Sequence, residues 1–149
     1  MIIRDILNFK GGTVFSIAPD GLVADAVATM VNNDIGSLVV LEHGRMAGML
    51  TFREVLQGLN ARAGNLGDLR AADVMVREPL TCKPDDTSES LREAMATQHV
   101  RYVPVMDAGQ LLGVISFHDI AKSVIKEASF ENRLLKRYIK NWPEQEAPR

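Results

Sequence analysis

The sequence has few of the features that mark secreted, membrane-spanning or nucleic-acid-binding proteins. It holds one cysteine in 149 residues, so no internal disulfide can form and a reducing, cytoplasmic location is expected. No apolar run approaches the roughly 20 residues that cross a bilayer, and we expect no signal peptide. Lys and Arg number 17 against 19 Asp and Glu, and aromatic residues make up 5%. These values disfavour DNA binding and a stacking platform for single-stranded nucleic acid.

The sequence also lacks the residue clusters of common enzymes and metal sites. No cysteine pair, HExxH motif or Walker-type phosphate loop is present. His43, His99 and His118 have no histidine four residues away and no nearby cysteine, so we expect no metal site. No nucleophile and base form a recognisable pair, so no catalytic residue is predicted and the chain is not expected to be an enzyme.

What the sequence does contain is an internal repeat at a constant offset of 65 residues. Glycines, a Pro-Asp pair, methionines and hydroxyl residues all recur at this offset, which indicates a duplicated unit. The matching positions are Ser16 and Thr81, Pro19-Asp20 and Pro84-Asp85, Met30 and Met95, Gly44 and Gly109, Gly48 and Gly113, Thr51-Phe52 and Ser116-Phe117, and Glu54 and Asp119.

Each copy is predicted to fold as strand, helix, strand, strand, helix. Apolar residues at helical spacing follow the first strand, and two β-branched runs joined by a glycine-containing turn predict a hairpin. A second helix is expected to begin near Phe52 and Phe117. The expected strands are residues 14–17, 38–41 and 46–51 in the first copy, and 80–83, 103–106 and 111–116 in the second.

The fold class expected is α/β (α+β), with two pseudo-symmetric repeats packed sheet to sheet over a shared core. We assign residues 1–65 to the first repeat with its N-terminal segment, and 66–128 to the second. Residues 58–72, which contain three glycines, form the predicted linker. The last helix of the repeat is expected to end near Lys126, and residues 129–149 supply an extra amphipathic helix over 131–142 and a tail. This helix is either a dimer contact or packs back on its own core.

Two segments carry a resemblance to a known family. Gly-Met-Leu-Thr-Phe-Arg-Glu (48–54) and Gly-Val-Ile-Ser-Phe-His-Asp (113–119) resemble the signature of CBS (cystathionine-β-synthase) domains. Ile35–Val40 and Arg101–Val105 are similar to the strand that precedes it. The resemblance covers residues 1–126, and the C-terminal helix is similar to that of small bacterial proteins made only of a CBS pair.

The resemblance implies a regulatory module that senses cellular energy state through an adenine nucleotide. In this family the cleft between repeats binds AMP, ADP, ATP, NAD or S-adenosylmethionine, and two modules usually pair into a disc-like homodimer. No cofactor is required, and the ligand state would pass to a separate effector protein. The alternative is a protein-interaction or dimerisation scaffold with vestigial ligand sites, which Glu54 in place of the usual Asp favours.

Carried over residue by residue, the resemblance implies two ligand clefts. What we call the Asp119 cleft comprises Ser116, His118 and Asp119 with Ser16, Ile35 and Gly36 from the first repeat. The Thr51 cleft comprises Thr51, Arg53 and Glu54 with Thr81, Val100, Arg101 and Tyr102 from the second. We rank the Asp119 cleft higher, because Glu54 is one methylene longer than Asp.

Simpler roles stay open for several of these residues. Ser116 with Asp119, and Thr51 with Glu54, also fit the capping box at the start of a helix. Arg101 is either a phosphate clamp or a surface arginine. Tyr102 is expected to pack, and Lys10 to be a solvated surface lysine.

Overall fold

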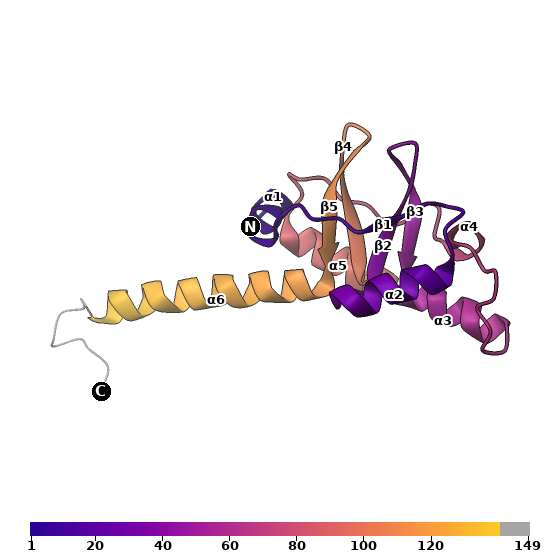
Figure 1. Cartoon of the computed structure of the whole chain (residues 1–149). Helices are drawn as coiled ribbons and strands as arrows, with labels where there is room; N and C mark the ends of the chain where they lie inside the picture. The colour runs from indigo at the N-terminus through magenta and orange to yellow at the C-terminus, as the bar shows by residue number, and fades with distance from the viewer. Residues whose placement is uncertain (141–149) are drawn as a thin grey trace.

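The computed structural model describes residues 1–140, which form two repeats followed by a long projecting helix (Figure 1). A short helix, which we call the leading helix, precedes each repeat: α1 (Ile3–Lys10) precedes the first and α4 (Ala71–Val74) the second. The first repeat then comprises β1 (Ser16–Ile17), α2 (Val23–Asn33), β2 (Ser37–Glu42), β3 (Arg45–Thr51) and α3 (Phe52–Ala61). The second comprises α5 (Ser88–Gln98), β4 (Tyr102–Asp107), β5 (Gln110–Ser116) and α6 (Phe117–Lys140).

The two hairpins confirm the prediction from the β-branched runs. Strands β2 and β3 pair antiparallel, as do β4 and β5. The turns are two residues long, with φ of 53° and 77° at His43 and Gly44, and 50° and 80° at Ala108 and Gly109. Positive φ at both positions matches the right-handed twist of the strands, and glycine adopts it without a steric cost.

The first strand of each repeat is shorter than predicted. Strand β1 pairs parallel to β2, with Ser16 opposite Val39. In the second repeat the corresponding segment makes a single parallel bridge, between Cys82 and Val105.

Burial raises the pKa of the Cys82 thiol to about 12, as expected for a small buried apolar residue.

The two repeats pack together as expected, but most of the buried residues fall into two clusters, one for each repeat, instead of one continuous core. One cluster belongs to the first repeat but includes Leu69, Ala71 and Met75 from the segment around α4. The other belongs to the second repeat but includes Ile3 and Ile6 from α1. The repeats therefore exchange their leading helices, and each core is completed by a segment that precedes the other repeat in the chain.

The linker is shorter than predicted, because α3 runs to Ala61 and α4 begins at Ala71. Gly58 lies inside α3 and is buried, so it is not a linker residue. A β-carbon at Gly58 would come within 2.8 Å of Leu69 Cδ2. This glycine therefore lets the linker pack closely on the helix.

Helix α6 is one continuous helix of 24 residues, so the predicted break between residues 126 and 131 is wrong. Beyond the repeats it extends away from the rest of the molecule (Figure 1). The end of the predicted C-terminal helix, including Trp142, lies outside the described residues. Within residues 1–140, no helix combines the length and apolar character that a membrane span requires.

Candidate ligand site

Both signature motifs form capping boxes at the start of a helix. At α3, Glu54 Oε1 accepts hydrogen bonds from the backbone N–H and the hydroxyl of Thr51, both at 2.8 Å. At α6, Asp119 Oδ2 accepts from the Ser116 N–H at 2.8 Å, and Ser116 Oγ accepts from the Asp119 N–H at 3.0 Å. The capping role is thus confirmed for both motifs, and it holds each carboxylate at a fixed position beside a helix N-terminus.

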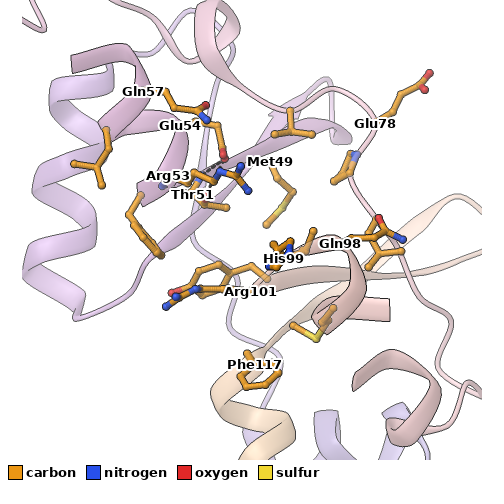
Figure 2. A pocket seen from close by; sticks show the side chains of 18 of the residues that line it. Met49, Thr51, Arg53, Glu54, Gln57, Glu78, Gln98, His99, Arg101 and Phe117 are labelled. Atoms are coloured by element: carbon orange, nitrogen blue, oxygen red, sulfur yellow. Dashed lines mark hydrogen bonds between the residues drawn. The ribbon is translucent and has the colours of Figure 1, made fainter. Parts of the chain in front are cut away.

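A cavity of about 1020 Å³ lies where the Thr51 motif faces the second repeat. Figure 2 shows Thr51, Arg53 and Glu54 on one side and His99, Arg101 and Phe117 on the other. Its volume is at the upper end of the range typical of small-molecule sites. Because its walls come from both repeats, an occupant would contact both.

The structure brings most of the predicted Thr51 cleft together in this cavity. Thr51, Arg53, Glu54, Val100, Arg101 and Tyr102 all line it. Thr81 does not, although its neighbours Pro79 and Leu80 do. The lining also includes residues that the sequence analysis missed, namely Met49, Phe52, Leu56, Gln57, Asn60, Val76, Glu78, Met95, Ala96, Gln98, His99 and Phe117.

The missed residue with the clearest chemistry is His99. It ends α5 in the left-handed conformation, with a φ of 55°. The residue at the same place in the first repeat is Asp34, with a φ of 51°. The sequence offered one signal for this residue, because a histidine stands directly before Val100 and Arg101 where the first repeat has an aspartate. In the structure the His99 imidazole lies beside Arg101 in the cavity lining (Figure 2).

The lining combines three kinds of chemistry. Met49, Val76 and Leu80 supply apolar surface, and Arg53 and Arg101 supply guanidinium groups. Glu54, a residue that is 6% exposed, supplies a carboxylate. The Arg101 guanidinium carbon lies 5.8 Å from the centroid of the Phe52 ring, which orients it over an aromatic face. Such a lining suits a ligand with a flat apolar part, hydroxyl groups and a negative charge.

Asp119 is engaged by a lysine from the leading helix of the other repeat. Lys10 Nζ donates to Asp119 Oδ2 at 2.6 Å and to the carbonyl of Val114 at 2.7 Å. Partial burial acts to raise the pKa of Asp119, but the hydrogen bonds from Lys10 and Ser116 outweigh it, and the net pKa lies below its usual value. Lys10 is therefore an ion-pair partner, not the solvated surface lysine that we expected.

The residues predicted for the Asp119 cleft do not line the larger cavity. Asp119 lines a cavity of about 220 Å³ with Lys10, Lys122 and Lys126, while Ser16, Ile35, Gly36 and Ser116 line neither this cavity nor the larger one. His118 is exposed. A β-carbon at Gly36 would clash with the hydroxyl oxygen of Tyr102, so Tyr102 fills the space beside Gly36. Tyr102 therefore packs as predicted, and its pKa is raised by burial.

Comparison with known proteins defines the family. The model of the CBS domain matches residues 3–61 and 71–126, so the chain belongs to the CBS domain family and carries two copies of the domain. Among residues 1–140, no group of three or more His, Cys, Asp or Glu side chains is arranged to hold a metal ion.

Similar proteins include CBS domain-containing proteins from a plant and from a bacterium. The chain is 27% identical over 146 residues to the CBS domain-containing protein CBSX3, mitochondrial, of Arabidopsis thaliana, covering 92% of this chain and 71% of that one. The crystal structure of the CBS-domain containing protein ATU1752 from Agrobacterium tumefaciens is 27% identical, with a TM-score of 0.79 over 83% of this chain and 98% of that one. The CBS domain pair of protein MJ0100, solved in complex with 5′-methylthioadenosine and S-adenosyl-L-methionine, shares the fold at 19% identity and a TM-score of 0.72, covering 85% and 98%.

Proposed function

We propose that this chain is a regulatory module that binds an adenosine-containing ligand, such as AMP, ADP, ATP, NAD or S-adenosylmethionine, in the cavity of the Thr51 cleft. The observation that carries the proposal is the cavity of about 1020 Å³, which unites the signature motif of the first repeat with Val100 and Arg101 of the second. The adenosyl complexes of the MJ0100 pair support it, because a pair of the same fold holds such ligands.

The lining offers a partner for each part of such a ligand. The purine would lie on the apolar wall of Met49, Val76 and Leu80. Both capping bonds of Glu54 fall on Oε1, so Oε2 is the oxygen that would accept from the ribose hydroxyls. The guanidinium groups of Arg53 and Arg101 would each donate paired hydrogen bonds to phosphate oxygens, and His99 lies beside them.

The regulatory step follows from the two-sided lining. A ligand that contacts both repeats binds most tightly to one angle between them, and it shifts the population toward that arrangement only through this difference in affinity. A separate effector protein would read the arrangement.

Isothermal titration with AMP, ATP, NAD and S-adenosylmethionine tests the proposal directly. We expect at least one of them to bind at concentrations up to the millimolar range and to raise the melting temperature by mass action. Arg101→Ala should weaken binding of a phosphorylated ligand about tenfold or more, since a hydrogen bond to a charged group contributes about 1.5–3 kcal/mol. Arg45→Ala is the matched control, because Arg45 is exposed and does not line the cavity.

A scaffold without ligand is the second candidate, and one observation favours it. Both signature carboxylates are already bonded within the chain, Glu54 by Thr51 and Asp119 by Ser116 and Lys10. If none of the four compounds binds or shifts the melting temperature at millimolar concentration, the scaffold function replaces the ligand-sensing one.

A further inference from the structure

The Lys and Arg residues of α6 lie on one side of the helix. Each of them is three, four or seven positions from another, and residues at these spacings share one side of a helix. All are exposed, and the row continues onto the part of α6 that extends beyond the two repeats (Figure 1). At 1.5 Å per residue the row is about 27 Å long. We call it the basic face, and its members are Lys122, Lys126, Arg133, Lys136, Arg137 and Lys140.

Within residues 1–140, no member of the basic face forms an ion pair. The only acid there that stands three or four positions from a member is Asp119, which precedes Lys122 and is bonded to Lys10. Lys126 contacts the ring of Phe9, with its Nζ 4.0 Å from the centroid. Like charges three or four positions apart destabilise a helix. A partner that supplies carboxylates would relieve this repulsion.

The charge of the described chain is divided between two regions. Residues 1–121 carry 10 Lys and Arg against 15 Asp and Glu, a net charge of −5. Residues 122–140 carry six against two, a net charge of +4, and the two acids, Glu127 and Glu131, lie on another side of α6. The small net charge of the whole chain hides this separation. A concentrated positive field of this kind attracts an anionic partner and orients it on approach.

The form of the basic face disfavours nucleic acid and lipid as partners. Single strands bind in basic grooves with several stacking aromatic residues, whereas this face is one row of cations with Phe130 as its single aromatic neighbour at matching spacing. A long nucleic acid would also run over residues 1–121, which carry the opposite charge to the face. Insertion of α6 into a bilayer would bury Glu131, which lies four positions before Leu135, and burial of that charge is costly.

We propose that the basic face of α6 binds an acidic helical segment of a partner polypeptide that differs from this chain. A helix with Asp or Glu at three- and four-residue spacing presents its carboxylates in one row, which matches the row of cations on α6. Arg133 and Arg137 contribute most, because a guanidinium group binds a carboxylate through two hydrogen bonds.

This binding does not require a ligand in the cavity of the Thr51 cleft. The identification of the partner as the effector protein does rest on the proposed function. Phe117, the first residue of α6, lines that cavity, so the helix that carries the basic face begins at the ligand site.

Fluorescence anisotropy with the ligand-free full chain tests the proposal. The probe is a labelled alanine-rich peptide of about three heptads with Glu at three- and four-residue spacing. The control probe has the same composition with Glu spread around the helix. We expect the first probe to bind about fivefold or more tightly than the control, and its affinity to fall with salt. Absence of binding at low salt, or equal affinity for the two probes, would overturn the proposal.

A matched pair of double substitutions tests the residues. Arg133→Gln/Arg137→Gln should weaken binding about fivefold or more, and the melting transition should remain because both side chains are exposed and Gln suits a helix. Arg45→Gln/Arg92→Gln removes the same charge from exposed positions outside α6 and should change the affinity by less than about twofold. Equal losses for the two variants would show an effect of net charge alone and contradict the proposal.

Three further measurements separate the acidic segment from other occupants. Hydrogen exchange should slow in α6 from Lys122 onward when the peptide is added, and protection confined to residues 1–121 would contradict the proposal. Tighter binding of oligo-dT or of phosphatidylglycerol vesicles than of the peptide would assign the face to nucleic acid or to membrane. Analytical ultracentrifugation should show the same oligomeric state for Arg133→Gln/Arg137→Gln as for the wild type. A changed state would assign the face to contact between copies and overturn the proposal.

Discussion

The two signature motifs have the same local structure but different surroundings. Thr51 with Glu54 and Ser116 with Asp119 each form a capping box at the start of a helix. In the second repeat, Lys10 from α1 forms an ion pair with Asp119. In the first repeat, the motif lines a cavity of about 1020 Å³. The motif therefore specifies the helix start in both repeats, and the leading segment of the opposite repeat decides whether space remains beside it.

The leading segments differ because one helix is longer than the other. Both begin with the same bond, from the backbone N–H of Ile2 to Asp5 and from that of Arg70 to Asp73. Helix α1 then continues for eight residues, whereas α4 ends after four and the chain extends to pair Val76 with Met49. Counted from these matching starts, Glu78 stands in the position of Lys10. An extra helical turn and a change of charge thus distinguish Asp119, which is paired with Lys10, from Glu54, which lies beside the larger cavity.

The largest effect that distinguishes the two regions should come from the exchanged helices. Ile3 is fully buried in the core of the second repeat, although it belongs to the segment that precedes the first. Ile3→Ala should lower the free energy of unfolding by about 3 kcal/mol, from lost apolar burial and the cavity left behind. Urea denaturation measures this value. Asn8→Ala, at an exposed position of the same helix, is the control, and an equally small loss for both variants would show that α1 is not part of the core.

Ligand affinity should separate the two motifs by about tenfold. With the cavity at the Thr51 cleft, Glu54→Gln should weaken binding of the adenosine ligand at least tenfold, because an anionic acceptor is lost while an oxygen remains to cap α3. Asp119→Asn should change the affinity less than threefold. This order reverses the ranking that we made from the length of Glu54. Calorimetric titration of both variants checks it, and a greater loss for Asp119→Asn would restore the original ranking.

The smallest effect concerns the pH dependence of stability. The folded pKa of Asp119 lies below its ordinary value of 3.8, so its ionised form stabilises the fold above that pH, and the contribution is lost as the pH falls through the folded pKa. Lys10→Met should remove about 1 kcal/mol at pH 7 and reduce the loss of stability on acidification. Urea titrations at pH 7 and pH 3 measure both changes. Glu93→Gln, at an exposed position of α5, should leave the acid dependence unaltered, and the same profile in Lys10→Met would contradict the assignment.

The local features of the fold were predictable from the sequence because each depends on a few neighbouring residues. Gly44 and Gly109 indicated the hairpin turns, and the structure gives both a positive φ. The helix starts at Phe52 and Phe117 were predicted from their place after each hairpin, and the structure confirms both. Met30 and Met95, which recur at the repeat offset, are both buried.

The features that were missed depend on residues far apart in the chain. Lys10 and Asp119 are 109 positions apart, and nothing in the local sequence joins them. The exchange of leading helices does not alter the order of strands and helices within either repeat, so the sequence periodicity alone does not reveal it. The continuity of α6 was missed because the polar residues around Ser129 interrupt the apolar spacing, while the backbone continues regardless. The Thr51 cleft was found by the resemblance, but its open volume depends on where α4 ends.

The exchange of leading helices has a consequence for how the molecule gains its stability. Cutting the chain between residues 65 and 66 would leave Ile3 and Ile6 on one fragment and the core that they fill on the other. Leu69, Ala71 and Met75 would be separated from their own cluster in the same way. Neither fragment could complete its interior alone, so the two should become ordered only when mixed, and the intact protein should melt in a single cooperative transition.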